Sequence, residues 1–364
     1  MLEECVGFAE PTMSACPRCF VILGVYNPII GHLEQQIASI LGQTVKDIEL
    51  IVVPDGPQEE AERVIAGYRD SRIRLCRQDT HVGVYHNFQR GLETALTCSD
   101  QEVDLFAYCD QDDIWVPHKL QRQIDALAAS QAVMCYCDAK VVDDAGTVVY
   151  PSLFDAECRV RNCTVSELVL ENSVTGMTML FDKRVAQAAV NYPARIARHV
   201  HHDWWTALVA KVTGPVVFID EPLVAYRQHS ANVIGAQPWM PQGSGNRKRP
   251  FLSREYREMC VRHFVTRRFL VSELARLADQ GRQVGQSTPV LRGFTAGRGG
   301  AALLLATTAG MLIGGRRRCA TSGFRSLIGR LEIARRVFLE RGPLQFRSRY
   351  DAACEELLAP RLAR

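Results

Sequence analysis

Short apolar runs alternate with amphipathic segments through the first 140 residues of the chain. The runs are partly β-branched, as is typical of strands buried on both faces, and lie at 20–25, 48–53, 72–76, 103–108 and 132–137. Between them, apolar residues recur at helical spacing, as at Leu33, Ile37 and Ile40. This alternation predicts an α/β fold with a mostly parallel central sheet and helices on both faces.

The pattern is less regular after residue 160. It predicts a short helix at 164–171, a strand at 175–181 that is entered through a glycine, and a helix that begins at Asp203. Two short strands follow, at 216–219 and 223–226. We expect these elements to complete the same domain.

Polar residues directly follow three of the predicted strands. Tyr26 and Asn27 come after the first strand, Asp55 after the second, and an acidic cluster at 110–113 after the fourth. Open α/β sheets bind ligands beyond the carboxyl ends of their strands, so these residues predict one site. Neither a G-x-G-x-x-G sequence nor a Walker-type loop follows the first strand, which disfavours a dinucleotide fold or a phosphate-loop NTPase.

The acidic cluster 110–113 holds three carboxylates in four residues. Taken alone, it is typical of a solvated acidic turn, with Asp113 as a helix cap. At a strand end, however, Asp110 and Asp112 are placed to hold Mg²⁺ or Mn²⁺, which would link them to the diphosphate of a nucleotide ligand. Such an ion also stabilises a diphosphate as it leaves.

A second polar group, His202-Asp203-Trp204-Trp205, opens a predicted helix. Asp203 is a candidate general base for an acceptor hydroxyl, with capping of the helix as the alternative. His202, like His229 further along, is typical of a surface or core histidine. The tryptophans are core residues or, for one of them, a platform under a sugar ring.

Six short motifs together resemble glycosyltransferase family 2, and within it the bacterial rhamnosyltransferase-like members. The motifs, spread over residues 20–235, are Val25-Tyr-Asn27, Gln43-Thr44, Asp55-Gly56, Cys109-Asp-Gln-Asp-Asp-Ile-Trp115, His202-Asp-Trp-Trp205 and Tyr226-Arg-Gln-His229. Their joint occurrence is far more specific than any one of them. Family members often have Asp-Asp-Gly-Ser where this chain has Pro54-Asp-Gly-Pro57, which leaves the base preference open.

The resemblance implies a GT-A fold, an inverting reaction and a divalent metal, Mg²⁺ or Mn²⁺, at the D-x-D sequence. It implies metal ligands at Asp110, Asp112 and His229, and a catalytic base at Asp203. The donor-binding residues that it implies are Tyr26, Asn27, Asp55, Asp110, Gly176 and Trp204. Among these, Asp55 should contact the nucleobase with Tyr26 beside it, and Gly176 should face donor and acceptor.

Composition and cysteine content narrow the class of protein. With 47% hydrophobic and 23% charged residues, the chain is typical of a globular protein. Its 13 cysteines do not suggest a disulfide framework, and Cys16 with Cys19 makes only half of a zinc site. The first fifteen residues, with three glutamates and no Lys or Arg, do not resemble a secretory signal. A reducing cytoplasm is therefore the expected location.

Charge divides the chain near a stretch of linker composition at 242–246. Residues 1–246 carry 19 Lys and Arg against 31 Asp and Glu, whereas residues 247–364 carry 24 against 9. The expected organisation is an N-terminal extension (1–19), a catalytic domain (20–241), a linker (242–252) and a basic, mainly helical C-terminal region (253–364).

Two features of the basic region bear on partners. A long helix is expected at 253–280, and the uncharged stretch 299–315, followed by three arginines, is a buried helix, an interfacial segment or a membrane span. The arginines suit an anionic membrane face or a polyprenyl-diphosphate-linked acceptor, with packing against the acidic domain as the alternative. No recognisable module supports nucleic-acid binding.

These observations predict a metal-dependent, inverting glycosyltransferase that moves a sugar, with rhamnose as the candidate, from a nucleotide-diphosphate donor to a cell-surface glycan or lipid-linked acceptor. It would act in the cytoplasm, at the inner face of the membrane if the arginines contact lipid. The competing hypothesis is a non-catalytic module of the same fold that binds a nucleotide sugar or a glycan.

Overall fold

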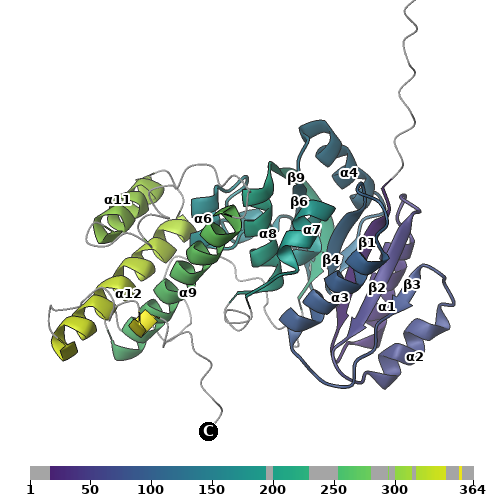
Figure 1. Cartoon of the computed structure of the whole chain (residues 1–364). Helices are drawn as coiled ribbons and strands as arrows, with labels where there is room; N and C mark the ends of the chain where they lie inside the picture. The colour runs from purple at the N-terminus through teal and green to yellow at the C-terminus, as the bar shows by residue number, and fades with distance from the viewer. Residues whose placement is uncertain are drawn as a thin grey trace, which may run out of the picture.

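The chain folds into an α/β body with a group of helices packed on one side (Figure 1). The computed structural model describes residues 17–193, 200–228, 253–279, 294, 300–313, 317–341 and 352–354. Within these ranges the body holds all the strands and the C-terminal part is helical, as predicted. Most of the predicted N-terminal extension and the whole predicted linker lie outside the described residues.

In the part of the chain that the structure describes, nine strands form one sheet at the centre of the body. Its strands are β1 (Cys19–Val25), β2 (Ile48–Pro54), β3 (Ile73–Leu75), β4 (Leu105–Cys109), β5 (Ile114–Trp115), β6 (Met134–Val142), β7 (Val148–Tyr150), β8 (Met179–Asp182) and β9 (Val216–Arg227). β1 to β4 are parallel, with β1 between β2 and β4. Because β8 is antiparallel to both β4 and β6, β6 and its parallel partner β9 run in the direction of β1. The predicted mostly parallel sheet is therefore confirmed.

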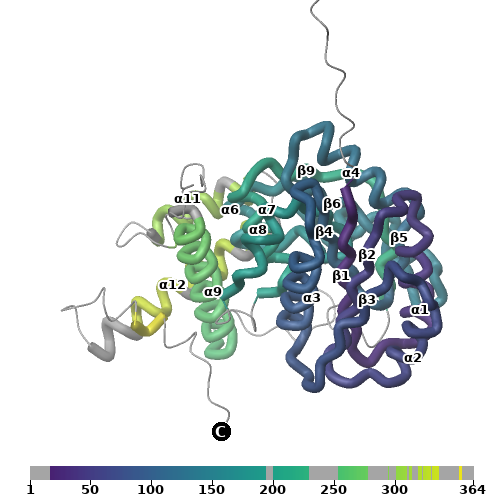
Figure 2. Tube along the Cα trace, turned by 45° about the vertical axis from the view of Figure 1, so that its right-hand side comes forward, coloured from purple at the N-terminus to yellow at the C-terminus, as the bar shows by residue number. Residues whose placement is uncertain are grey.

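Helices cover both faces of this sheet (Figure 2). One face carries α1 (Ile30–Leu41), α2 (Glu59–Gly67) and α4 (Lys119–Ser130), and the other carries α3 (Val84–Cys98), α7 (Lys183–Ala189) and α8 (His202–Thr213). Residues of β1 alternate between the faces, so Ile22 belongs to the core layer of α3 and Leu23 to that of α1. Gly91 allows α3 to approach β1 closely, because a Cβ there would come within 2.3 Å of Ile22 Cγ2.

The C-terminal helices pack on the α8 side of the body. They are α9 (Arg254–Asp279), α11 (Gly300–Ile313) and α12 (Arg317–Arg341), and α9 and α12 both contact α6 (Val165–Leu170) of the body. α9 lies beside α12, and α11 packs on α12 (Figures 1 and 2). Arg267 of α9 donates to the Leu170 carbonyl at 3.1 Å. At least one arginine of the basic C-terminal region, Arg267, therefore faces the body.

The segment 175–181 differs from the strand that was predicted. Gly176–Thr178 form a 3₁₀ turn, η1, and β8 starts only at Met179. A continuous apolar run does not distinguish a tight turn from a strand when both are buried. The consequence is that Gly176 lies beside the sheet edge rather than within a strand.

The two short strands expected at 216–219 and 223–226 form the single strand β9. Its register against β6 shifts beside Asp138, and this irregularity accommodates the polar pair Asp220 and Glu221 that interrupted the apolar pattern. In the stretch 299–315 the structure places the helix α11. Within the described parts of the chain, no helix has both the length and the apolar character needed to cross a membrane.

Candidate active site

The acidic cluster 110–113 begins where β4 ends and is tied to the end of β1 through Gln111. The Gln111 side chain accepts a hydrogen bond from the Tyr26 N–H at 2.8 Å and donates to the Tyr26 carbonyl at 3.0 Å. Gln111 is the central residue of the D-x-D sequence, and no sequence pattern indicated this role because Tyr26 lies 85 positions away. Gln111 thereby joins the ends of β1 and β4, which are two of the three strand ends of the predicted site.

Arg227, the last residue of β9, fixes the other side of the cluster. Its backbone N–H donates to Asp113 Oδ1 at 3.1 Å, and its Nε donates to the Asp112 carbonyl at 3.0 Å. The rest of the buried guanidinium donates to the Asp144 carbonyl and to Gln35 Oε1, both at 2.7 Å. The arginine of the Tyr-Arg-Gln-His motif thus positions the acidic loop, while His229 lies outside the described residues.

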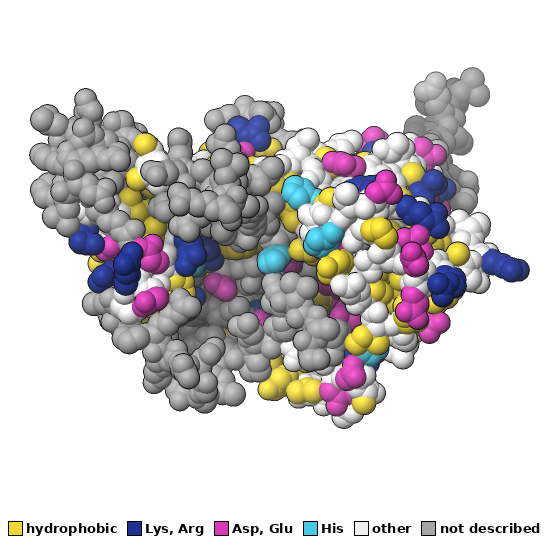
Figure 3. Space-filling model, turned by 90° about the horizontal axis from the view of Figure 1, so that it is seen from below, with side chains coloured by type: hydrophobic (Ala, Val, Ile, Leu, Met, Phe, Trp, Pro, Cys, Tyr) yellow, Lys and Arg dark blue, Asp and Glu magenta, His cyan; other side chains and the backbone are white. Residues whose placement is uncertain are grey.

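Carboxylates from two distant parts of the chain meet at this edge of the sheet. Burial, together with the negative charges of Asp112 and Asp203, raises the pKa of Asp110 to about 7. Burial, together with the negative charges of Asp112 and Asp110, raises the pKa of Asp113 well above its ordinary value. The structure therefore brings Asp110, Asp112 and Asp203 together, as predicted. Figure 3 views the molecule from below, toward the edge at which β1 and β4 end.

Asp203 lies in the first turn of α8 and is held by two backbone N–H groups. Its Oδ1 accepts from Trp204 N at 2.6 Å, and its Oδ2 accepts from Gly176 N at 3.3 Å. The N-cap of α8 is His201, so Asp203 is not the cap that was considered as the alternative. Burial raises the pKa of Asp203, while His201 and Arg159 act in the opposite direction.

Gly176 has a steric reason for being glycine. A Cβ at this position would lie 3.0 Å from His202 Nε2 and 3.6 Å from Asp203 Cβ. The absent side chain allows η1 to bring its backbone N–H to the Asp203 carboxylate. Gly176 therefore lies beside Asp203, and its predicted position facing donor and acceptor stays a prediction.

His202 is a core residue of an unusual kind. Its ring stacks on Phe88 at 3.8 Å between centroids, and within the described residues neither ring nitrogen has a hydrogen-bond partner. Burial lowers the pKa of His202 well below its usual value, so the imidazole is neutral. The core alternative holds, but without the hydrogen bonds expected of a core histidine.

Asp55 is 2% exposed and organises the loop that precedes α3. Its carboxylate accepts from the backbone N–H groups of Val82 at 2.7 Å and Gly83 at 3.0 Å, and it pairs with His81 Nδ1 at 2.9 Å. Both carboxylate oxygens are therefore engaged within the protein. Asp55 therefore positions the loop before α3, and its predicted contact with a nucleobase stays a prediction.

Tyr26 and His81 form an aromatic pair beside Asp55. The rings stack at 4.5 Å between centroids, and Tyr26 remains 45% exposed. Asn27, the next residue, has φ at +44°, which is uncommon for a residue with a side chain, and its N–H donates to Gln58 Oε1 at 2.9 Å. His81 was not singled out from the sequence, since it lies in a loop without periodicity.

The tryptophans of the His-Asp-Trp-Trp motif point into the core. Trp204 Nε1 donates to the Leu168 carbonyl at 2.7 Å, and the Arg267 guanidinium lies 4.9 Å from the ring centroid. Trp205 Nε1 donates to the Ala189 carbonyl at 3.1 Å. The Trp204 ring is buried by these contacts and cannot serve as a platform for the donor sugar. Its contribution to the site is the backbone N–H that binds Asp203.

The acidic loop fits a divalent metal that is completed by other ligands. Among the described residues, no three or more acidic, histidine or cysteine side chains are arranged to hold an ion by themselves. Mg²⁺ is usually bound in proteins by one or two carboxylates together with substrate phosphates, and Asp110 and Asp112 provide oxygens of that kind. Burial and then the neighbouring charges of Asp112 and Asp203 raise the pKa of Asp110, and a cation would offset that negative charge.

Comparison with known proteins agrees with the motifs. Residues 20–187 match the sequence profile of the family described as Glycosyl transferase family 2. The strand order, taken together with this match, agrees with the predicted GT-A type of fold. An uncharacterized glycosyltransferase of Rickettsia prowazekii is 26% identical over 220 residues, which are 59% of this chain and 65% of the relative. One of Methanocaldococcus jannaschii is 23% identical over 215 residues, covering 58% and 71%.

A solved structure shows a weaker likeness. The crystal structure of residues 1–349 of TarS from S. aureus, in complex with UDP-GlcNAc, has 13% sequence identity and a TM-score of 0.46, covering 88% of this chain and 91% of that one. Among the first three relatives by sequence, all from Rickettsia, the matched region spans 65%, 36% and 65% of their length.

Proposed function

We propose that the glycosyltransferase family 2 domain of this chain, residues 20–187, is part of an active, inverting enzyme that transfers a sugar from a nucleotide-diphosphate donor to an acceptor hydroxyl. The observation that carries the proposal is the meeting of Asp110, at the end of β4, with Asp203, at the start of α8. Their charges are close enough for Asp203 to raise the pKa of Asp110. Carboxylates in unlike surroundings can take different roles in one reaction.

Asp203 is the proposed general base. Its raised pKa favours uptake of a proton at neutral pH, and the N–H groups of Trp204 and Gly176 fix its orientation. As the proton of the acceptor hydroxyl passes to Asp203, the acceptor oxygen forms a bond to the anomeric carbon. The bond between that carbon and the diphosphate oxygen breaks on the opposite side, which inverts the configuration.

Asp110 and Asp112 are the proposed metal ligands, with His229 as a third. A bound Mg²⁺ or Mn²⁺ would offset the charge of the departing diphosphate. Arg227 and Gln111 hold the loop that carries both carboxylates, so that their spacing is set before any ion arrives.

The proposed nucleobase position lies against the exposed Tyr26 ring and His81. Their stacked rings provide an aromatic surface, and Asp55 pairs with His81. Rhamnose is the proposed donor sugar, and this choice is based only on the motif resemblance. The proposed acceptor is a cell-surface glycan or a polyprenyl-diphosphate-linked saccharide.

Peripheral binding to an anionic membrane surface, in the cytoplasm, is part of the proposal. α11 is apolar around its circumference, and among the described residues it packs mainly on α12, so Leu305, Leu312 and the 89% exposed Ile313 reach the surface. Three arginines, at 316–318, follow in the sequence after two glycines. Co-sedimentation with vesicles containing anionic lipid should be lost when Leu312 and Ile313 are changed to Ser, whereas vesicles of neutral lipid should bind neither form.

Donor turnover tests whether the domain is catalytic or only binds its ligand. We expect the chain to release nucleotide diphosphate from at least one member of a panel of nucleotide sugars when Mn²⁺ is present, and Asp112→Ala to lose this activity. Full turnover in Asp112→Ala would contradict the assignment of Asp112 as a metal ligand. Donor binding without turnover of any panel member would favour the non-catalytic alternative.

A further inference from the structure

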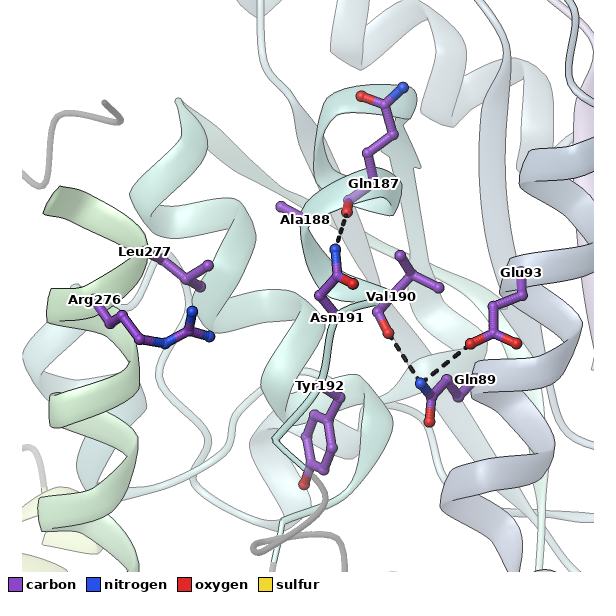
Figure 4. A pocket seen from close by; sticks show the side chains of 9 residues that line it. All are labelled: Gln89, Glu93, Gln187, Ala188, Val190, Asn191, Tyr192, Arg276 and Leu277. Carbon is purple, nitrogen blue, oxygen red and sulfur yellow. Dashed lines mark hydrogen bonds between the residues drawn. The ribbon is translucent and has the colours of Figure 1, made fainter. Parts of the chain in front are cut away.

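A cavity of about 780 Å³ lies between the α/β body and the C-terminal helix α9 (Figure 4). α3 contributes Gln89 and Glu93 to it, and α9 contributes Arg276 and Leu277. The end of α7 and the residues after it contribute the rest, which are Gln187, Ala188, Val190, Asn191 and Tyr192. The volume falls within the range of about 300–1,000 Å³ that is common for ligand sites.

The lining suits a ligand rich in hydroxyl groups. The Asn191 side chain donates to the Gln187 carbonyl at 3.3 Å, and its amide oxygen points away from that bond (Figure 4). Arg276 uses Nε in a pair with Glu273 at 2.9 Å and extends from α9 toward Asn191. Ala188, Val190 and the buried Leu277 add apolar surface. Donors and acceptors beside small apolar patches match the hydroxyl rim and C–H faces of a sugar.

The charge of the lining argues against a highly charged ligand. Glu93 and Arg276 have opposite charges, and the other side chains of the described lining are neutral. Among the described lining residues, a diphosphate would find Arg276 alone as a cation, and Arg276 is already paired with Glu273. The cavity therefore suits the saccharide part of an acceptor rather than its anionic lipid carrier.

Tyr192 lines the cavity and packs against α8, the helix that carries the proposed base. Its ring stacks on Tyr85 at 3.8 Å and meets the Trp205 ring edge-on at 5.5 Å, and Trp205 follows Asp203 by two positions. The charge of Asp203 also contributes to the raised pKa of Tyr192, after the larger effect of burial. Tyr26 and Asp55, at the proposed nucleobase position, do not line the cavity.

We infer that this cavity binds the saccharide chain of the acceptor, and that the C-terminal helical region takes part in acceptor recognition through Arg276 and Leu277. The inference rests on the proposed function, because the bound saccharide is an acceptor only if the protein transfers a sugar to it. Saccharide binding itself does not depend on turnover. It assigns a substrate-binding role to a region that lies outside the matched family domain.

An array of defined neutral and acidic oligosaccharides, probed with the full-length chain, tests the inference. We expect the wild-type chain to bind at least one saccharide, and Asn191→Ala and Arg276→Ala each to weaken that binding by about tenfold or more. Arg262→Ala is the matched control, because Arg262 is an exposed arginine of α9 that does not line the cavity. Its binding should equal that of the wild type.

Two further results separate this inference from the proposed function. Asp112→Asn should bind the array like the wild type, because the change lies at the metal site, and the Asn191 and Arg276 variants should keep the wild-type rate of donor hydrolysis by water. A wild-type chain that binds no saccharide of the array would overturn the inference. Equal binding by the wild type and both cavity variants would overturn it as well.

Discussion

The N–H of Gly176 donates a hydrogen bond to the Asp203 carboxylate at 3.3 Å across 27 positions of the sequence. The contact depends on the absence of a side chain at Gly176, because a Cβ there would lie 3.0 Å from His202 Nε2. The turn before β8 and the start of α8 are therefore packed around one carboxylate. This arrangement makes Gly176 a positioning residue for the proposed base.

Gly176→Ala should slow donor turnover by at least about tenfold and lower the free energy of unfolding by about 1–3 kcal/mol, because His202 is buried and has little room to move. Nucleotide release and urea unfolding measure the two effects. Gly67→Ala is the matched control, since nothing lies within 4 Å of a Cβ at that position. Wild-type turnover in Gly176→Ala would show that the close approach is not needed.

The metal-free protein should lose stability as the pH rises toward neutrality. The pKa of Asp110 is about 7 in the fold, above its unfolded value, so protonated Asp110 favours the folded state. Its contribution is complete below about pH 4, where the unfolded side chain is also protonated, and is lost as the pH rises through 7.

Asp112→Asn should relieve this loss by removing one of the repelling charges. We expect the melting temperature of the metal-free variant to exceed that of the wild type by a few degrees at pH 8, with a smaller difference at pH 5. Thermal unfolding in the presence of a chelator measures both. An Asp112→Asn protein less stable than the wild type at pH 8 would mean that the Asp112 charge is compensated within the fold.

Affinity for Mn²⁺ should increase between pH 6 and pH 8, because Asp110 must release its proton to become a ligand. Isothermal titration with Mn²⁺ in the presence of a nucleotide diphosphate measures the trend. Asp110→Asn should bind weakly at both pH values. A wild-type affinity that does not change with pH would argue against Asp110 as a ligand.

Arg227→Lys should destabilise the acidic loop although it keeps the positive charge. The planar guanidinium serves the Asp112 carbonyl, the Asp144 carbonyl and Gln35 at once, and an ammonium group cannot reproduce that geometry. We expect a loss of about 2–3 kcal/mol in urea unfolding together with weaker Mn²⁺ binding. Arg74→Lys, which changes a surface ion pair with Glu49, should leave both unchanged.

The parallel core was predictable because β1, β2 and β4 are continuous apolar runs with helical patterns between them. The strand-end rule placed Asp110 at the predicted site, and the family resemblance added Asp203 to it. The tertiary partners of polar side chains could not be inferred. Gln111 and Arg227 bind atoms 85 and 115 positions away, and no local pattern identifies such partners.

The Trp204 assignment shows the same limit for an aromatic side chain. The letters His-Asp-Trp-Trp place Trp204 beside a base, but the direction of its ring depends on α6 and α9, which pack on it through Leu168 and Arg267. Asp55 was correctly placed at a strand end, yet the engagement of both its oxygens by the loop before α3 depends on tertiary structure.

The most direct measurement compares the wild type with Asp203→Asn in two assays, Mn²⁺-dependent release of nucleotide diphosphate from the donor and binding of that nucleotide diphosphate. The central claim predicts unchanged nucleotide binding and turnover slowed by about 10²–10⁴-fold, because the variant keeps hydrogen-bond acceptor capacity at Asp203 but cannot take up a proton. Wild-type turnover in Asp203→Asn, or loss of binding and turnover together, would contradict the assignment of Asp203 as the base.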